Sequence, residues 1–365
     1  MKLTPLARSL PASVPFVGPE AQERARRAPF AARLGANESP FGASPRALAA
    51  IAEAASDAWM YGDPEYHDLR HALAAHHGVA PENIVAGEGI DGLLGYLVRL
   101  TVAPGDAVVT SAGAYPTFDY HVTGHGGVLH RVPYRGDHED PDALADEARR
   151  VGAGLVYLAN PDNPMGSWHH ADRIGAMLDA LPADALLCLD EAYADLAPPE
   201  AIPPIAPDDA RVIRMRTFSK AHGLAGLRVG YAIGPAALIA AFDRVRNHFG
   251  LGRVAQAGAL AALQDPDWLA EIRARVIQSR DAIAAIAREN GLTPLPSATN
   301  FVMIDCGGDG DHARAVLAAL VRRDVFVRMP GVAPLDRCIR ISCGTAADMD
   351  ALRAALPDSL RDAGS

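Results

Sequence analysis

The centre of this sequence is the segment from residue 214 to residue 231, which reads Arg214-Met215-Arg216-Thr217-Phe218-Ser219-Lys220-Ala221-His222-Gly223-Leu224-Ala225-Gly226-Leu227-Arg228-Val229-Gly230-Tyr231. Of the 34 basic residues in the chain, only Lys2 and Lys220 are lysines. Arginine keeps its charge at working pH, whereas a buried lysine amine can lose its proton and attack a carbonyl group. Lys220 is therefore either an accident of composition or the one place where the chain requires an amine.

The residues beside Lys220 favour a required amine. Thr217 and Ser219 add hydroxyl donors, and Arg228 adds a permanent cation that can neutralise an anion. An amine, two hydroxyls and a guanidinium are the groups that a protein needs to hold pyridoxal phosphate (PLP) by its aldehyde and its phosphate. The segment therefore predicts a PLP site.

The strings Thr217-Phe218-Ser219-Lys220 and Gly226-Leu227-Arg228-Val229-Gly230 resemble the Schiff-base segment of fold-type I PLP-dependent aminotransferases of class I/II. The histidinol-phosphate aminotransferase group is the most similar branch, and the resemblance runs from about residue 34 to about residue 350. It implies an α/β homodimer whose large domain has a mostly parallel sheet between helices, followed by a small α/β C-terminal domain. We expect an N-terminal arm over 1–36, the large PLP-binding domain over 37–250, and the small domain over 251–365 with a contribution from the arm.

The resemblance also implies an activity. The chain is expected to be a transaminase that moves an amino group between an amino acid, or histidinol phosphate, and a 2-oxo acid through a Schiff base with Lys220. Lys220 then carries a proton between the substrate Cα and the C4′ atom of the cofactor. A related PLP enzyme, such as a threonine-phosphate decarboxylase, has the same motifs and stays open as an alternative.

The bulk composition agrees with a globular enzyme of small molecules. A length of 365 residues suggests more than one domain, and a net charge of -10 argues against nucleic acid or an anionic membrane as a partner. No stretch approaches the ~18 apolar residues of a membrane span, and the first residues lack the apolar core of a signal peptide. We therefore expect a cytoplasmic protein.

The cysteines and histidines predict no metal site. No two cysteines form a CxxC pair, so we expect reduced core residues. Adjacent histidines point apart on a helix and are expected at the surface. The residues concerned are Cys188, Cys306, Cys338 and Cys343, and the pairs His76-His77 and His169-His170.

A glycine-rich turn precedes the expected helix after residue 88. Gly87, Gly89 and Gly92 match the G-x-G-x-x-G pattern, which lets a phosphate approach the N–H groups at a helix N-terminus. We assign Gly89, Ile90 and Asp91 to the PLP phosphate. The same pattern leaves a nicotinamide-dependent oxidoreductase as a remote alternative, which would leave Lys220 unexplained.

Four stretches predict buried strands, and each ends in a polar cluster. Because α/β sheets bind ligands at the carboxyl ends of their strands, we expect these clusters to meet in one site. The stretches are 107–111, 154–159, 185–189 and 211–216.

The polar clusters supply the expected contacts to the cofactor ring. A buried carboxylate needs a cation, and Asp190 is assigned to the protonated pyridine nitrogen. By resemblance Tyr115, just before Pro116, stacks on the ring, and Tyr193 bonds to the phenolate oxygen. Asn163 is assigned to that same oxygen, because Asn160-Pro161-Asp162-Asn163-Pro164-Met165-Gly166 resembles the family's Asn-Pro-x-Asn-Pro-Thr-Gly loop with Met165 in place of Thr.

The remaining site residues follow from the resemblance. Arg340 matches the arginine that binds the substrate carboxylate, Arg328 a second arginine on the substrate side, and Asn37 a loop that faces the substrate. Tyr61 matches a tyrosine that reaches the cofactor phosphate of the other subunit. Glu20 stands where a phosphate-binding tyrosine is expected; because an acid repels phosphate, we expect an amino acid with a basic or polar side chain in place of histidinol phosphate.

Local patterns place further elements. Ser44 and Pro45 predict the start of a helix, and a second helix is expected over 66–77. The arm should hold one short helix within 21–32, and the region 235–285 should be helical with a break near residue 250. Strands are expected over 298–304, 325–328 and 338–342.

Overall fold

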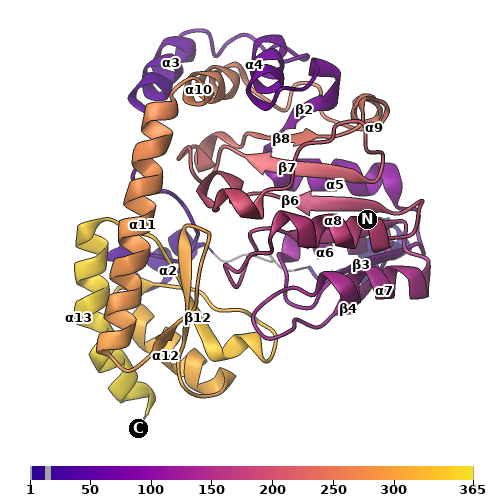
Figure 1. Ribbon diagram of the computed structural model, residues 1–365. Coiled ribbons are helices and arrows are strands. Elements are labelled where there is room, and N and C mark those ends of the chain that lie inside the picture. Colours follow the sequence, from indigo (N-terminus) through magenta and orange to yellow (C-terminus); the bar gives the residue numbers. More distant parts are fainter. Residues whose placement is uncertain (1, 13–17, 365) are drawn as a thin grey trace.

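The computed structural model describes residues 2–12 and 18–364. Its largest sheet has the strand order β2-β8-β7-β6-β5-β3-β4 (Figure 1). β8 runs antiparallel to β2 and β7, and the other neighbours are parallel. The strands are β2 (Ile84–Gly87), β3 (Ala107–Ser111), β4 (Val128–Val132), β5 (Leu155–Ala159), β6 (Leu186–Asp190), β7 (Val212–Thr217) and β8 (Gly230–Ile233).

Both faces of this sheet are covered, as the prediction of buried strands implies. On β5, Leu155 and Tyr157 belong to one buried cluster, while Val156 and Leu158 belong to another on the opposite face. The first cluster lies under α5 and α6, and the second under α7 and α8. These helices are α5 (Gly89–Thr101), α6 (Pro116–His125), α7 (Pro141–Val151) and α8 (Ala171–Ala180).

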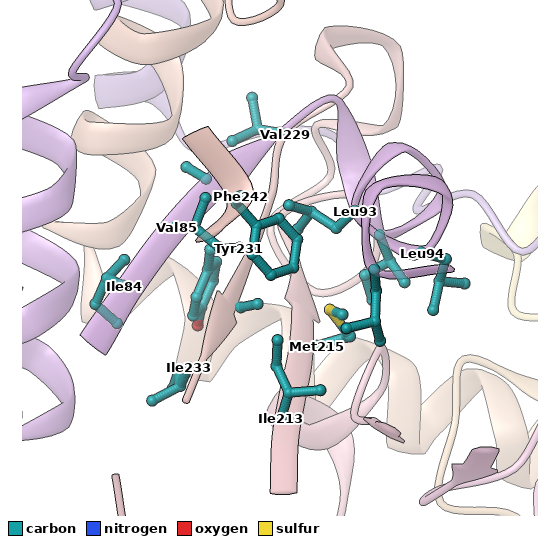
Figure 2. Packing of buried hydrophobic residues seen from close by; sticks show 14 of the residues in the cluster. Ile84, Val85, Leu93, Leu94, Ile213, Met215, Val229, Tyr231, Ile233 and Phe242 are labelled. Carbon is teal, nitrogen blue, oxygen red and sulfur yellow. The ribbon is translucent and has the colours of Figure 1, made fainter. Parts of the chain in front are cut away.

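The antiparallel end of the sheet carries a dense apolar core. Figure 2 shows side chains of β2, β7 and β8 together with Leu93 and Leu94 of α5 and with Phe242. Leu93, Met215 and Phe242 have no exposed surface, and each such side chain stabilises the fold by roughly 1.5–3 kcal/mol. This core holds β7, and thus Lys220 just after it, against the start of α5.

Helices α3 (Pro45–Ala55), α4 (His67–His77) and α10 (Arg253–Leu263) pack together at this end of the molecule (Figure 1). The predicted start of α3 is confirmed, because Ser44 Oγ accepts a hydrogen bond of 2.9 Å from the Ala47 N–H. The expected break in the region 235–285 separates α9 (Ala236–Ala241) from α10.

A second apolar core lies in the C-terminal part, below the sheet in Figure 1. The long helix α11 (Pro266–Glu289) enters it at Ile272. A three-stranded antiparallel sheet has the order β12-β10-β9, and a two-residue parallel pair joins β1 to β11. The elements are β9 (Thr293–Pro294), β10 (Phe301–Asp305), α12 (Gly310–Arg322), β11 (Val325–Phe326), β12 (Cys338–Ser342), α13 (Ala346–Ala363) and, from the arm, β1 (Ala32–Arg33).

Some local predictions are wrong. The described arm has two short helices, α1 (Pro5–Ser9) and α2 (Pro19–Arg26). β10 begins at Phe301 because side-chain hydrogen bonds of Ser297 and Thr299 to nearby backbone N–H groups hold the chain in a turn before it. β11 ends at Phe326, and Arg328 meets β12 only through an isolated bridge to Arg340.

Two of the histidines also differ from expectation. His77 is half-buried, and its Nε2 lies 2.9 Å from the Tyr231 hydroxyl. His169 is half-buried too, and its ring bonds to the backbone oxygen of Glu139. The four cysteines are buried and unpaired, as predicted. Within the described ranges, no helix combines the length and the apolar character that a membrane crossing requires.

Single turns of 3-10 helix join several elements. They are η1 (Pro81–Asn83), η2 (Ala194–Leu196), η3 (Pro199–Ala201), η4 (Ala225–Leu227), η5 (Phe242–Arg244) and η6 (Leu335–Arg337).

Candidate active site

Two adjoining cavities lie at the carboxyl ends of β5, β6 and β7. The inner cavity has a volume of about 340 Å³, and the outer cavity about 500 Å³. Their common wall includes Ala36, Tyr115, Asn163 and Lys220. Most of the residues predicted to bind the cofactor line the inner cavity: Ile90, Asp91, Tyr115, Asn163, Asp190, Tyr193, Thr217, Ser219, Lys220 and Arg228. The outer cavity adds three predicted substrate residues, namely Asn37, Arg328 and Arg340.

Lys220 projects into this space from the turn that follows β7. Its Nζ donates a hydrogen bond of 3.0 Å to the backbone oxygen of Asn37. Burial, together with the positive charges of Arg340 and Arg228, lowers the pKa of Lys220 to about 8. A substantial fraction of this amine is therefore neutral near pH 8.

Asp190 ends β6 at the floor of the inner cavity. The Tyr157 hydroxyl donates to its Oδ2 at 2.7 Å, and the Ala192 N–H donates to its Oδ1 at 2.9 Å. Burial raises the pKa of Asp190 to about 6 despite these hydrogen bonds. A cation placed in the cavity would restore the charged form, so the carboxyl group fits a protonated ring nitrogen.

The other end of the inner cavity is built for an anion. Helix α5 begins at Gly89, so its first N–H groups are not used within the helix. Gly89 has φ of +80°, and a Cβ there would collide with the guanidinium of Arg228. Arg228 Nη1 donates to Ser219 Oγ at 3.3 Å, and Thr217 Oγ1 donates to the same atom at 2.9 Å. A phosphate group matches this set of donors.

A directed chain of hydrogen bonds ends at Tyr193. The Asn37 N–H donates to Ser342 Oγ at 3.0 Å, so the hydroxyl donates its own proton to Asn37 Oδ1 at 2.8 Å. Because Oδ1 faces Ser342, the Nδ2 group of Asn37 faces Tyr193 and donates to its hydroxyl at 3.1 Å. The phenol accepts there, and its proton is left to donate into the cavity. Asn37 thus acts on the cavity through Tyr193.

Arg340 lines the outer cavity, and no carboxylate of residues 2–12 and 18–364 forms an ion pair with it. Its Nη1 donates to Asn163 Oδ1 at 2.5 Å and its Nη2 to the Gly35 backbone oxygen at 3.0 Å, while the buried Nε has no partner among the described residues. Burial lowers the pKa of this guanidinium to about 10. An incoming carboxylate would supply the missing acceptor and the missing charge.

Two predicted residues lie elsewhere. Tyr61 is 78% exposed, its ring lies 4.8 Å from that of Phe249, and it lines neither cavity. Glu20 also lies outside both cavities, where its carboxylate pairs with Arg33 at 2.9 Å on the arm. The acid at residue 20 therefore does not face the substrate space of its own chain.

Sequence reasoning missed Tyr157, Glu38 and Ser342. Tyr157 and Glu38 line the inner cavity, and Ser342 orients Asn37. Tyr157 is the one polar residue of a buried apolar strand, and a buried hydroxyl needs a partner, which is a signal that could have found it.

The fold and this site define a fold-type I enzyme that depends on pyridoxal phosphate, and the comparisons with known proteins agree. Residues 32–356 match the family Aminotransferase class I and II. The chain belongs to this family and is an aminotransferase.

Several relatives cover almost the whole chain. The histidinol-phosphate aminotransferase 1 of Mesorhizobium japonicum is 37% identical over 90% of both chains. An Anaeromyxobacter histidinol-phosphate aminotransferase is 36% identical over 96% of this chain and 97% of its own. The crystal structure of the Sinorhizobium meliloti histidinol-phosphate aminotransferase in complex with pyridoxal-5'-phosphate superposes with a TM-score of 0.96, at 56% identity over 99% of this chain and 98% of that one. The nicotinamide alternative is thereby set aside.

Proposed function

We propose that this aminotransferase takes histidinol phosphate as its amino donor and a 2-oxo acid as its acceptor. The observation that carries the proposal is the position of two arginines, Arg328 and Arg340, in the outer cavity beside Lys220. Histidinol phosphate presents a phosphate and a 2-oxo acid presents a carboxylate, and both are anions that arginine binds in a bidentate manner. The names of the relatives at 36–37% identity support the same substrate.

The position of Glu20 removes the reason for preferring another donor. Its carboxylate is paired with Arg33 and faces solvent, so its negative charge lies away from both cavities. A phosphate in the outer cavity would meet arginines and no acid from residue 20 of the same chain.

We assign the chain's residues to the cofactor as follows. PLP, when bound, supplies an electron-withdrawing ring that stabilises negative charge at the substrate Cα. The ring nitrogen is assigned to Asp190, the ring oxygen to Tyr193 and Asn163, and the ring face to Tyr115. The phosphate is assigned to the N-terminus of α5, at Gly89, Ile90 and Asp91, and to Thr217, Ser219 and Arg228.

Lys220 is assigned the proton transfer as well as the covalent link to the cofactor aldehyde. An amine with a pKa of about 8 exists in both forms near neutral pH, so it can accept a proton from the substrate Cα and return one. Asn37 holds the amine through its backbone oxygen, and Arg340 orients the substrate by its anionic group.

We also propose a homodimer in which Tyr61 contacts the phosphate held by the partner subunit. Trp59, Tyr61 and Phe249 are large apolar side chains with more than half of their surface exposed, which favours an interface at this face. The reduced, buried cysteines support a cytoplasmic location.

The test is turnover of histidinol phosphate against matched compounds. We expect kcat/KM for histidinol phosphate to exceed that for histidinol, which lacks the phosphate, and that for histidine by at least tenfold. Arg328→Met should remove this preference while leaving the cofactor bound. Equal rates for all three compounds would contradict the proposed donor, and release of carbon dioxide from a phosphorylated amino acid would instead favour a decarboxylase.

A further inference from the structure

Two carboxyl groups are buried together behind the 160–166 loop, away from both cavities. Glu139 and Asp162 are each 2% exposed. Their side chains hydrogen-bond to each other. Glu139 lies just before α7, and Asp162 is next to Asn163, which lines both cavities. The reaction assigned above uses neither carboxyl group.

The two groups differ in the donors that surround them. Glu139 accepts from Ser111 Oγ at 2.5 Å and from the Ala159 N–H at 3.0 Å. Asp162 accepts from the Tyr134 hydroxyl at 2.9 Å, from the Met165 N–H at 3.0 Å and from the Asn163 N–H. More donors stabilise a charged carboxylate more strongly, so Asp162 is the better site for the negative charge.

The surroundings do not supply charge for a second carboxylate. Among the described residues, the titratable groups near the pair include the Tyr134 and Tyr157 phenols and the His169 ring, which bonds to the Glu139 backbone oxygen. Burial lowers the pKa of His169, which keeps this ring neutral. Arg340 acts from farther away, since it is bound to Asn163 and feels the charge of Asp162. Two buried like charges without a paired cation are costly, so one proton must remain.

We propose that Glu139 is a positioning residue that stays protonated and donates its proton to Asp162, thereby holding the 160–166 loop and Asn163 in place. Within the loop, the Asp162 carboxylate accepts hydrogen bonds from the Met165 and Asn163 N–H groups, which ties the loop backbone to Asp162. Asn163 can then present its Oδ1 to Arg340 and its amide N–H to the cavity. Whether Glu139 holds the loop does not depend on which substrate the enzyme uses. Only the benefit of this hold for cofactor binding rests on the proposed function.

The direction of the pH effect follows from burial. Burial raises the pKa of Glu139 well above its usual range and that of Asp162 to about 7. In the unfolded chain Glu139 loses its proton near its ordinary pKa of about 4.3, whereas the folded chain keeps it. The stabilisation is thus complete below that pH and is lost as the pH rises toward the raised pKa. One retained proton changes the unfolding equilibrium about tenfold per pH unit.

The test compares Glu139→Gln with Asp162→Asn in the holoenzyme. A glutamine keeps an acceptor for the Ala159 N–H and replaces the acid O–H with a permanent N–H donor, and the Ser111 hydroxyl can turn to accept. An asparagine at residue 162 would place its NH₂ group against one of the O–H or N–H groups that donate to Asp162 in the wild type. We expect Glu139→Gln to fold and to lose the contribution of the Glu139 proton, so that between about pH 5 and pH 7 its unfolding equilibrium changes about tenfold per pH unit less than the wild-type slope. Glu271→Gln, an exposed control, should keep it.

Infrared spectra of the wild type provide a second readout that does not require a stable variant. A carboxylic-acid C=O band should persist above pH 7, where Asp162 has lost its proton, and should be missing from Glu139→Gln at the same pH. Asp162→Asn should be much less stable than Glu139→Gln at pH 7. Absence of the band, an unchanged pH slope in Glu139→Gln, or a stable Asp162→Asn beside an unstable Glu139→Gln would overturn the proposal. None of these results depends on which amino donor the enzyme accepts.

Discussion

Replacing Asn37 tests the hydrogen-bond chain that fixes the proton of Tyr193. Asn37 has φ of +55°, a left-handed conformation in which glycine is relaxed and alanine is strained. Asn37→Gly therefore removes the side chain alone, whereas Asn37→Ala removes the side chain and adds backbone strain. The pair separates the two contributions at one position.

The magnitude follows from the bonds that are lost. The Asn37 side chain makes a hydrogen bond of 3.1 Å to Tyr193 and one of 2.8 Å to Ser342, both buried. Two neutral hydrogen bonds contribute about 1–3 kcal/mol together. Asn37→Gly should lower the free energy of unfolding by about 2 kcal/mol, and Asn37→Ala should be about 1 kcal/mol less stable still.

Asn37→Gly should also weaken PLP binding, because it removes a hydrogen bond that orients the Tyr193 hydroxyl. Without the incoming bond from Asn37, the Tyr193 hydroxyl is free to rotate, and the loss of one oriented neutral hydrogen bond raises the dissociation constant of PLP by roughly 2- to 13-fold. In a Tyr193→Phe background, Asn37→Gly should then have no further effect on PLP binding, because the two residues act through one bond.

The measurements are urea unfolding of the apoenzyme and PLP titration of the apoenzyme by absorbance, in a double-mutant cycle. Ser342→Ala serves as a companion variant, since it should cost less stability in the Asn37→Gly background than in the wild type. Equal stability of Asn37→Gly and Asn37→Ala would refute the backbone argument. Additive effects of Asn37→Gly and Tyr193→Phe on PLP binding would refute the directed chain.

Three further outcomes are expected. The apoenzyme amine of Lys220 should react with an amine-selective acylating reagent with a midpoint near pH 8, because its pKa is lowered. Peptide mass spectrometry reads the modification, and a midpoint near the ordinary lysine pKa of about 10.4 would contradict the desolvated amine. When equal amounts of the inactive Lys220→Ala and Tyr61→Phe chains are mixed, about half of the dimers contain one chain of each kind. If Tyr61 acts on the partner's site, each mixed dimer has one intact site of two, so the mixture should recover about a quarter of wild-type activity. If Tyr61 acts on its own site, the mixture should recover none. Gly230→Ala should weaken PLP binding and cost roughly 1–3 kcal/mol, because its Cβ would lie 2.7 Å from the Ile90 nitrogen, whereas Gly154→Ala, with open space around it and outside both cavities, should change little.

The sheet and its functional edge could be predicted from local sequence. An apolar run such as Leu155–Ala159 has one stable use in an α/β protein, which is a strand covered on both faces. Because parallel strands end at one edge, Asp190 and Lys220 had to approach each other, and the structure places both in the inner cavity. The start of α3 was equally local, since a cap needs only Ser44 and the next turn.

The contacts that orient the site could not be predicted in this way. Ser342 and Asn37 are 305 residues apart, and their bond depends on how two cores pack. The bond from Tyr157 to Asp190 depends on the register of β5 against β6, which neither strand encodes alone. The pairing of Glu20 could not be predicted either, because its partner Arg33 lies on β1, which folds back onto α2.

The position of Arg340 makes the substrate space dependent on both cores. β12 carries Arg340 within the C-terminal core, yet its guanidinium binds the Asn163 side chain and the Gly35 backbone. A displacement of β12 relative to the large sheet would therefore move the anion-binding arginine and pull on the 160–166 loop at the same time. The proton shared by Glu139 and Asp162 anchors that loop from behind. Weakening either support should raise KM for the 2-oxo acid and loosen the Asn163 contact to the cofactor ring, while the contacts to the cofactor phosphate stay in place, since the phosphate donors belong to α5 and the β7 turn.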